Sequence, residues 1–238
     1  MLLSSFPAAA FGTNCYVVAP AEGEECVVVD PGIDVLDDLA RVLSTHRLRP
    51  AAVLLTHGHL DHVYSVTPVC GAHGVPALVH TDDRYRLADP LATLDPYLVT
   101  MLEQQFGRKA TWVEPSDVRS VTDDERLDVA GLALTVRHAP GHTEGSVLFT
   151  VDDVPDSLRG AAGDPGRPTS TAIAGDVLFA GSIGRTDLPG GSHEAMLRSL
   201  RDVVLPLPDD TLVLPGHGPA TTIARERATN PYLLEVAH

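Results

Sequence analysis

Cysteine is scarce in this chain of 238 residues, which contains only Cys15, Cys26 and Cys70. Three cysteines are too few, and too odd in number, for a disulfide framework. Two of them lie in apolar runs typical of strands, where a buried thiol packs as a small hydrophobic group. We therefore expect reduced thiols and a cytoplasmic protein.

Long apolar runs are also absent. No stretch approaches the ~18 apolar residues that a membrane-spanning helix needs. The N-terminal segment Met1–Pro7 lacks the basic residues that open a signal peptide, and the small residues after it come too early for one. The sequence therefore predicts neither a membrane anchor nor export.

Positive charge is in short supply, because 17 lysine and arginine residues stand against 32 acidic ones and the net charge is −15. An acidic chain repels the phosphates of nucleic acids and of anionic membrane surfaces. We therefore expect a small-molecule partner, with no nucleic acid and no membrane. The oligomeric state is left open.

Apolar residues, by contrast, are abundant at 44% of the chain. A chain of this length and composition can bury a full core, and α/β units of this size commonly form one domain. We expect a single domain over residues 1–238. Residues 155–171 are rich in Gly, Pro, Ser and Asp without a hydrophobic period, which predicts a flexible surface insertion.

Apolar periodicity predicts the elements within this domain. A helix is expected over residues 35–46, capped by Asp34 and stabilised at its N-terminal end by Asp37 and Asp38. Ser192 is expected to cap a second amphipathic helix. Residues 82–106 are expected to be helical or loop-like, and strands are expected at residues 14–19, 25–30, 51–55, 127–138, 146–151 and 172–179.

A dense group of potential metal ligands follows the predicted strand at residues 51–55. It consists of His57, His59, Asp61 and His62. Histidine and aspartate are poor strand and core residues, and four of them at one strand end would repel or stay unsatisfied without a cation between them. Because tight turns cannot fold all four around one ion, the group predicts part of a metal site that other segments complete.

Three later segments offer the missing ligands. Each places a histidine or an aspartate beside a glycine at the end of an apolar run, at His142, Asp176 and His217. Glycine beside a ligand lets the backbone approach an ion closely. Any one of the three could be an ordinary hydrogen-bonded residue, but together with the earlier group they indicate a metal centre.

The string His-x-His-x-Asp-His, followed by a lone His, a lone Asp and a last lone His, resembles the metallo-β-lactamase superfamily over nearly the whole chain. The resemblance implies an α/β fold of the four-layer αββα sandwich type, with two metals at one edge between similar halves. It also implies that Asp30, which ends an apolar run, orients ligand imidazoles. An Asx turn before Pro31 is the alternative interpretation of Asp30.

Carried over residue by residue, the resemblance implies two metal sites joined by a bridging Asp176. One site would be held by His57, His59 and His142, and the other by Asp61, His62 and His217. Imidazoles and carboxylates together suit Zn, Fe or Mn, so ligand chemistry alone leaves the element open. Two divalent ions are expected, with zinc as the first candidate.

Such a centre predicts hydrolysis of an activated acyl bond or of a phosphoester. Two metals can lower the pKa of a shared water towards ~7, which provides hydroxide at neutral pH. Asp61 is expected to accept the hydrogen bond of that hydroxide and fix its direction. The sequence contains no Gly-x-Ser-x-Gly motif, which removes the commonest serine-hydrolase alternative.

Two weaker signals concern the substrate. Residues 181–187 and 222–232 resemble the glyoxalase II branch, which hydrolyses S-acyl thioesters of glutathione, and Arg185 matches the substrate-binding basic residue of that branch. Pairing of Arg185 with Asp187 is the alternative. The C-terminal extension that holds the glutathione carboxylate in full-length members is missing here. We therefore expect a short glyoxalase II-like thioesterase of the hydroxyacylglutathione hydrolase type, whose thiol carrier is open.

Other functions compete with this interpretation. Persulfide dioxygenases resemble the same branch but use one iron held by two histidines and an aspartate. A lactonase or another small-ester hydrolase also fits the ligands, as does a non-catalytic metal-binding protein. A nucleic-acid-processing member is disfavoured because the chain is acidic and has no basic stripe.

Overall fold

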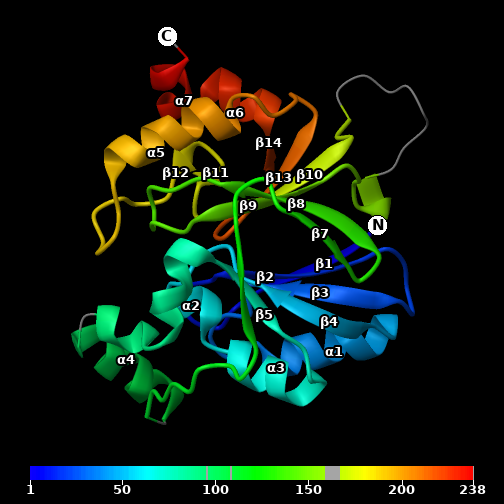
Figure 1. Cartoon of the computed structure of the whole chain (residues 1–238), viewed down its shortest axis with the longest axis vertical. Helices are drawn as coiled ribbons and strands as arrows, with labels where there is room; N and C mark the ends of the chain where they lie inside the picture. Colours follow the sequence, from blue (N-terminus) through cyan, green and yellow to red (C-terminus); the bar gives the residue numbers. More distant parts are fainter. Residues whose placement is uncertain (95, 108, 159–166, 238) are drawn as a thin grey trace.

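The protein is described by a computed structural model that covers residues 1–94, 96–107, 109–158 and 167–237. Two six-stranded sheets pack face to face, and helices cover the outer surface of each sheet (Figure 1). The strand order is β1-β2-β3-β4-β5-β6 in the first sheet and β14-β13-β10-β9-β8-β7 in the second. This architecture confirms the expected αββα sandwich.

The first half of the chain builds one sheet and its helical layer. Its strands β1 to β3 are antiparallel, and β3 to β6 are parallel. The strands are β1 (Leu2–Pro7), β2 (Asn14–Ala19), β3 (Glu25–Val29), β4 (Arg49–Leu54), β5 (Ala77–His80) and β6 (Val118–Val121). The helices are α1 (Leu36–His46), α2 (Leu60–Val63), α3 (Val66–His73), the 3₁₀ segments η1 (Thr81–Leu87) and η2 (Pro90–Thr93), and α4 (Pro96–Phe106).

The second half builds the other sheet, in which β10 and β13 are parallel and the remaining pairs are antiparallel. Its strands are β7 (Arg126–Val129), β8 (Leu132–His138), β9 (Val147–Val151), β10 (Ser170–Gly175), β13 (Thr211–Pro215) and β14 (Thr221–Thr222), with a short hairpin of β11 (Leu178–Phe179) and β12 (Ser182–Ile183). The helices are η3 (Asp156–Leu158), α5 (His193–Ser199), the π-helical η4 (Leu200–Val204), α6 (Ile223–Thr229) and α7 (Pro231–Val236).

Alternating side chains of each strand enter two different apolar layers. Val27 and Val29 of β3 face the second sheet, where they cluster with Phe149 and Ile173. Val28, between them, points to the opposite side and packs in the layer beneath the helices of the first half. Burial on both faces explains why these strands are continuous apolar runs rather than alternating ones.

The first predicted helix begins slightly later than expected. Val35 occupies the N-cap position of α1 and no side chain caps it, so the predicted Asp34 cap is wrong. Asp34 has a φ of +62°, whereas an N-cap residue needs an extended backbone to reach the first-turn amides. The acidic first turn of Asp37 and Asp38 is confirmed, and the Ser192 hydroxyl does cap α5, where it accepts a hydrogen bond from the Ala195 amide at 3.2 Å.

Three predicted boundaries are also wrong. The run 127–138 forms two strands because Ala130 and Gly131 have positive φ and turn the chain between β7 and β8. The run 172–179 breaks after Gly175, which has a φ of +47°. The predicted insertion at 155–171 extends too far, because Ser170 and Thr171 already pair with β13; residues 159–166 lie outside the described part of the chain.

Among the described residues, every helix is too short or too polar to span a bilayer.

The three cysteines are buried free thiols, and we expect all of them to be unreactive in the folded protein. Burial raises the pKa of Cys26 to about 12 and that of Cys70 to about 11, and it also raises the pKa of Cys15. Thiolate, the reactive form, is therefore nearly absent at pH 8. Titration with a disulfide reagent is expected to show three thiols only after denaturation, and a thiol that reacts within seconds in the native protein would contradict this.

Candidate metal centre

The predicted ligands meet where four strands end at one edge of the sandwich. His57 follows β4, His142 follows β8, Asp176 follows β10 and His217 follows β13. Strands β8, β10 and β13 run in the same direction, since β8 and β10 are both antiparallel to β9 and β10 is parallel to β13. Their carboxyl ends therefore share one edge, and the structure brings all seven predicted ligands together there.

The first predicted triplet has the spacing of metal ligands. His59 Nδ1 lies 2.8 Å from His142 Nε2, which lies 3.2 Å from His57 Nε2. Nitrogen ligands about 2.0–2.1 Å from a tetrahedral zinc ion lie ~3.3 Å from one another. Three imidazole nitrogens that converge at these distances therefore fit around a single cation.

The second triplet converges around the Asp61 carboxylate. Its Oδ2 lies 3.3 Å from His217 Nε2 and 3.5 Å from His62 Nε2. Asp176 lies between the triplets, with Oδ1 3.4 Å from His62 Nε2 and Oδ2 3.5 Å from both His142 Nε2 and His217 Nε2. A carboxylate in this place reaches ligands of both triplets, as a bridging ligand must.

Two buried atoms at this centre have no hydrogen-bond partner. They are His62 Nε2 and Asp176 Oδ1. A buried polar atom left unpaired costs roughly 1–3 kcal/mol, and a cation between a lone pair and a carboxylate oxygen removes that penalty. Together with the nitrogen spacing, these two atoms show that the residues fit a pair of divalent ions.

The remaining polar atoms of the ligands are held by neighbouring groups. Asp30 is buried, and its carboxylate accepts hydrogen bonds from the Thr56 amide and hydroxyl at 2.8 and 2.6 Å and lies 2.9 Å from His62 Nδ1. His142 Nδ1 lies 2.7 Å from the backbone carbonyl of Arg185, and His217 Nδ1 lies 3.1 Å from that of Phe11. These contacts point the Nε2 atoms of His62, His142 and His217 into the centre.

Burial favours the metal-binding protonation state in the first triplet. Burial, reinforced by His142, lowers the pKa of His59 to about 3, and burial lowers the pKa values of His57 and His142 too. Burial would raise the pKa of Asp61, but the neighbouring His62 and His217 outweigh it and lower the value. The first triplet therefore presents neutral imidazoles at neutral pH, beside an ionised carboxylate.

Burial alone would lower the pKa of His62 and of His217. The nearby carboxylates of Asp61 and Asp176 outweigh burial in both residues and raise the pKa. Burial would raise the pKa of Asp176, but the neighbouring His62 outweighs burial and lowers it. Without a cation the second triplet therefore tends to hold protons, and a metal ion must displace them to bind.

Asp83 is a residue of this region that sequence reasoning missed. Its buried carboxylate accepts hydrogen bonds from the Gly58 amide at 2.7 Å, the Thr143 hydroxyl at 2.8 Å and the Gly145 amide at 2.8 Å. Arg86, also buried, donates to it at 3.2 Å. Asp83 thus ties the loop of His57 and His59 to the loop of His142, and no sequence signal distinguishes it from its neighbour Asp82.

A further group of His80, Asp82 and His138 lies within ligand distance but does not have the geometry of a metal site. The two imidazoles are stacked, with centroids 3.9 Å apart and planes inclined by 14°. An ion cannot lie in the planes of two rings stacked in parallel, which is where the nitrogen lone pairs point. His138 Nε2 also lies 2.8 Å from the Glu144 carbonyl, and His80 Nδ1 accepts a hydrogen bond from the Asp82 amide.

The candidate metal centre opens into a cavity of ≈ 560 Å³, which Arg185 also lines. The Arg185 guanidinium donates two hydrogen bonds of 2.7 Å to the Asp187 carboxylate, so the pairing considered as an alternative does occur. Both side chains are largely exposed, at 61% and 67%. The position of Arg185 on the cavity wall still allows contact with a substrate, which stays a prediction.

Comparison with known proteins agrees with this geometry. The family model for the metallo-beta-lactamase superfamily matches residues 8–155. The chain belongs to the metallo-β-lactamase superfamily. It is 31% identical to hydroxyacylglutathione hydrolase GloC of Haemophilus influenzae over 236 residues, which cover 98% of each chain. Membership of this superfamily and the histidine–aspartate cluster support a metal-dependent hydrolase.

Solved structures of the superfamily share the fold of the whole chain. The BLEG-1 B3 metallo-beta-lactamase has 34% sequence identity and a TM-score of 0.76, covering 98% of this chain and 99% of that chain. TTHA1623 in a di-iron-bound form has 32% identity and a TM-score of 0.72, covering 97% of this chain and 100% of that chain. The second structure shows that this fold can hold two irons.

Proposed function

We propose that this chain is a binuclear metal-dependent hydrolase of S-acyl thioesters, similar in reaction to glyoxalase II. The observation that carries the proposal is the presence of two complete ligand triplets, with Asp176 between them, beside one substrate-sized cavity. Members of both triplets line this cavity together with Asp176, namely His59, Asp61, His142 and His217. A single iron held by two histidines and an aspartate does not require the second triplet. Similarity to GloC over nearly the full length of both chains supports the thioester class.

The proposed roles follow from the positions of the residues. His57, His59 and His142 would hold one ion, Asp61, His62 and His217 the other, and Asp176 would contact both. When bound, such ions supply an electrophile for the carbonyl oxygen and a water of lowered pKa. Zinc is the first candidate, and iron is the alternative that the di-iron neighbour supports.

Asp61 is proposed to direct the attacking water. Its Oδ2 accepts a hydrogen bond of 2.9 Å from the Thr13 hydroxyl, which fixes the carboxylate in the cavity. The lowered pKa keeps this carboxylate ionised, so it can accept a hydrogen bond from the O–H of the attacking water and aim the water oxygen at the acyl carbon. Hydrolysis then forms one C–O bond and breaks one C–S bond, releasing a carboxylate and a thiol. Arg185, at the cavity wall, is proposed to contact the polar part of the thiol carrier.

The test compares four substrates with one preparation of the purified chain whose metal content has been measured. They are S-lactoylglutathione, an S-acyl-N-acetylcysteamine, a homoserine lactone and glutathione persulfide under oxygen. We expect about two metal ions per chain and thioester hydrolysis without oxygen uptake. Oxygen-dependent persulfide oxidation with one iron per chain would instead identify a dioxygenase, and a lactone cleaved orders of magnitude faster than any thioester would identify a lactonase.

A further inference from the structure

The cavity beside the metal centre has a second, apolar wall to which the proposed chemistry gives no role. It is formed by side chains from four separate segments, namely the loop after β1, the η2–α4 region, the β11–β12 hairpin and the loop before α5. The residues are Phe11, Leu94, Leu98, Phe179, Ile183 and Leu188. Segments so far apart in sequence converge on the same space as the ligands.

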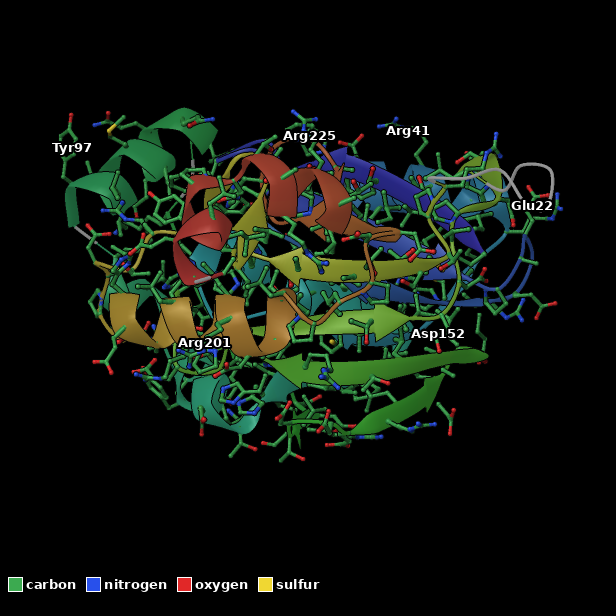
Figure 2. The ribbon with its side chains drawn as sticks, turned by 90° about the horizontal axis from the view of Figure 1, so that it is seen from above. Glu22, Arg41, Tyr97, Asp152, Arg201 and Arg225 are labelled. Atoms are coloured by element: carbon green, nitrogen blue, oxygen red, sulfur yellow. The ribbon has the colours of Figure 1, made fainter. Side chains whose placement is uncertain are left out.

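This wall keeps large apolar groups in contact with water. Phe11 is 49% exposed and Leu98 is 38% exposed, whereas Tyr97 and Met101 on α4 are exposed but do not line the cavity. Figure 2 shows Tyr97 on the outer side of α4 at one end of the molecule, opposite Glu22. Clustered apolar exposure is unfavourable, and where it lines a cavity it marks a ligand-binding surface.

The apolar wall directly adjoins the metal centre. The rings of Phe179 and His217 meet edge to face, with centroids 6.1 Å apart. The Phe11 carbonyl accepts a hydrogen bond from His217 Nδ1, so this residue is tied to the centre through its own backbone. A group attached to a carbonyl carbon at the centre therefore lies within reach of this wall.

Away from the proposed ion sites, the described cavity wall offers no unmatched positive charge to an anionic substituent. Among the described residues that line it, Arg185 is the one with a guanidinium or ammonium group, and Asp187 already neutralises it through two hydrogen bonds. Asp61 and Asp176 also line the cavity, but their charge is committed to the two proposed ions. A carboxylate at the far end of the acyl group would lie among apolar side chains, and its burial there without a partner would be unfavourable.

We propose that Phe11, Leu94, Leu98 and Phe179 form an acyl-binding site, and that the preferred substrate carries an uncharged aliphatic acyl group longer than three carbons. This inference rests on the proposed thioesterase function and extends it from the reaction to the substrate class. A cavity of ≈ 560 Å³ has room for such a chain beside the ligands. The acyl chain would lie along α4 and β11, with the thiol carrier on the Arg185 side.

A series of thioesters of one thiol tests the inference. We expect kcat/KM to rise about ten- to a hundredfold from S-acetyl- to S-hexanoyl-N-acetylcysteamine, because each buried methylene adds to binding. If none of these esters is hydrolysed by metal-loaded protein, the thioesterase proposal itself fails. If all are hydrolysed but efficiency is flat or falls with chain length, the thioesterase proposal stands and the acyl site is overturned.

Two variants on α4 localise the effect. Leu98→Gln makes the wall polar, and we expect it to reduce the hexanoyl-to-acetyl ratio of kcat/KM about tenfold. Met101→Gln is the matched control, because Met101 is 48% exposed on the same helix but does not line the cavity. An unchanged ratio in Leu98→Gln, or an equal drop in Met101→Gln, would overturn this placement of the acyl chain.

A binding measurement removes any dependence on turnover. S-hexyl-N-acetylcysteamine is a thioether that cannot be hydrolysed, and calorimetry can compare it with the S-ethyl analogue. We expect the hexyl compound to bind the wild-type chain at least about tenfold more tightly, and Leu98→Gln to remove most of that difference. Equal Kd values for the two thioethers in the wild-type chain would refute the acyl site.

Discussion

Replacement of Asp176 by alanine is expected to lower hydrolysis by about a thousandfold or more and to reduce the metal content per chain. The physical reason is that one carboxylate serves both halves of the centre, with His62 Nε2 at 3.4 Å and His142 Nε2 and His217 Nε2 at 3.5 Å. Without it, Asp61 is the one carboxylate among the seven predicted ligands that is left to offset the charge of two cations. Elemental analysis and thioester turnover measure the two effects.

Asp202→Ala is the matched control for that prediction. Asp202 pairs with Arg201 on the exposed surface of η4, where solvent screens the ion pair and leaves it little effect on stability. We expect this variant to keep the metal content and turnover of the wild-type chain. An Asp176→Ala protein that retains both would disprove the ligand assignment, and one that loses metal but keeps its biological activity would indicate a non-catalytic metal-binding protein.

Replacement of Asp83 by alanine is expected to destabilise the folded chain by about 3–5 kcal/mol, because it leaves the buried Arg86 guanidinium without one of its carboxylates. It also removes the acceptor for two backbone amides, Gly58 and Gly145, that flank metal-ligand segments. The loops that carry His57, His59 and His142 then lose their common anchor. We expect metal affinity to fall about ten- to a hundredfold, as for other groups that position ligands.

The Asp83 prediction separates a positioning role from a merely structural one. Urea unfolding of metal-free protein gives the stability change, and competition with a chromophoric chelator gives the affinity of the fraction that remains folded. Asp82→Ala is the control, since Asp82 is the preceding residue and its side chain is 52% exposed. If Asp83→Ala loses stability but binds metal as tightly as Asp82→Ala, Asp83 supports the fold without positioning the ligands.

The local sequence was enough to predict elements whose stabilising contacts are themselves local. The acidic first turn of α1 and the Ser192 cap depend on neighbours within three or four positions, and the structure contains both. The Asp34 cap was wrong because the backbone of Asp34 adopts a left-handed conformation that no nearby residue signals. The strands at 127–138 and 172–179 were merged because apolar character continues through turns at Ala130 and Gly175.

The sequence by itself determined which donors the candidate centre offers, since the dense histidine–aspartate string and three glycine-flanked residues named the seven side chains that converge there. Only the tertiary structure decided how those donors are held and what they face. The anchor at Asp83, the carbonyls of Phe11 and Arg185 behind two imidazoles, and the apolar wall at Leu98 all join segments distant in sequence. The residue type alone tells whether a side chain can bind a metal. The groups that hydrogen-bond to the ligands, and the side chains that line the cavity, are brought there by packing between sheets and helices, which no local pattern encodes.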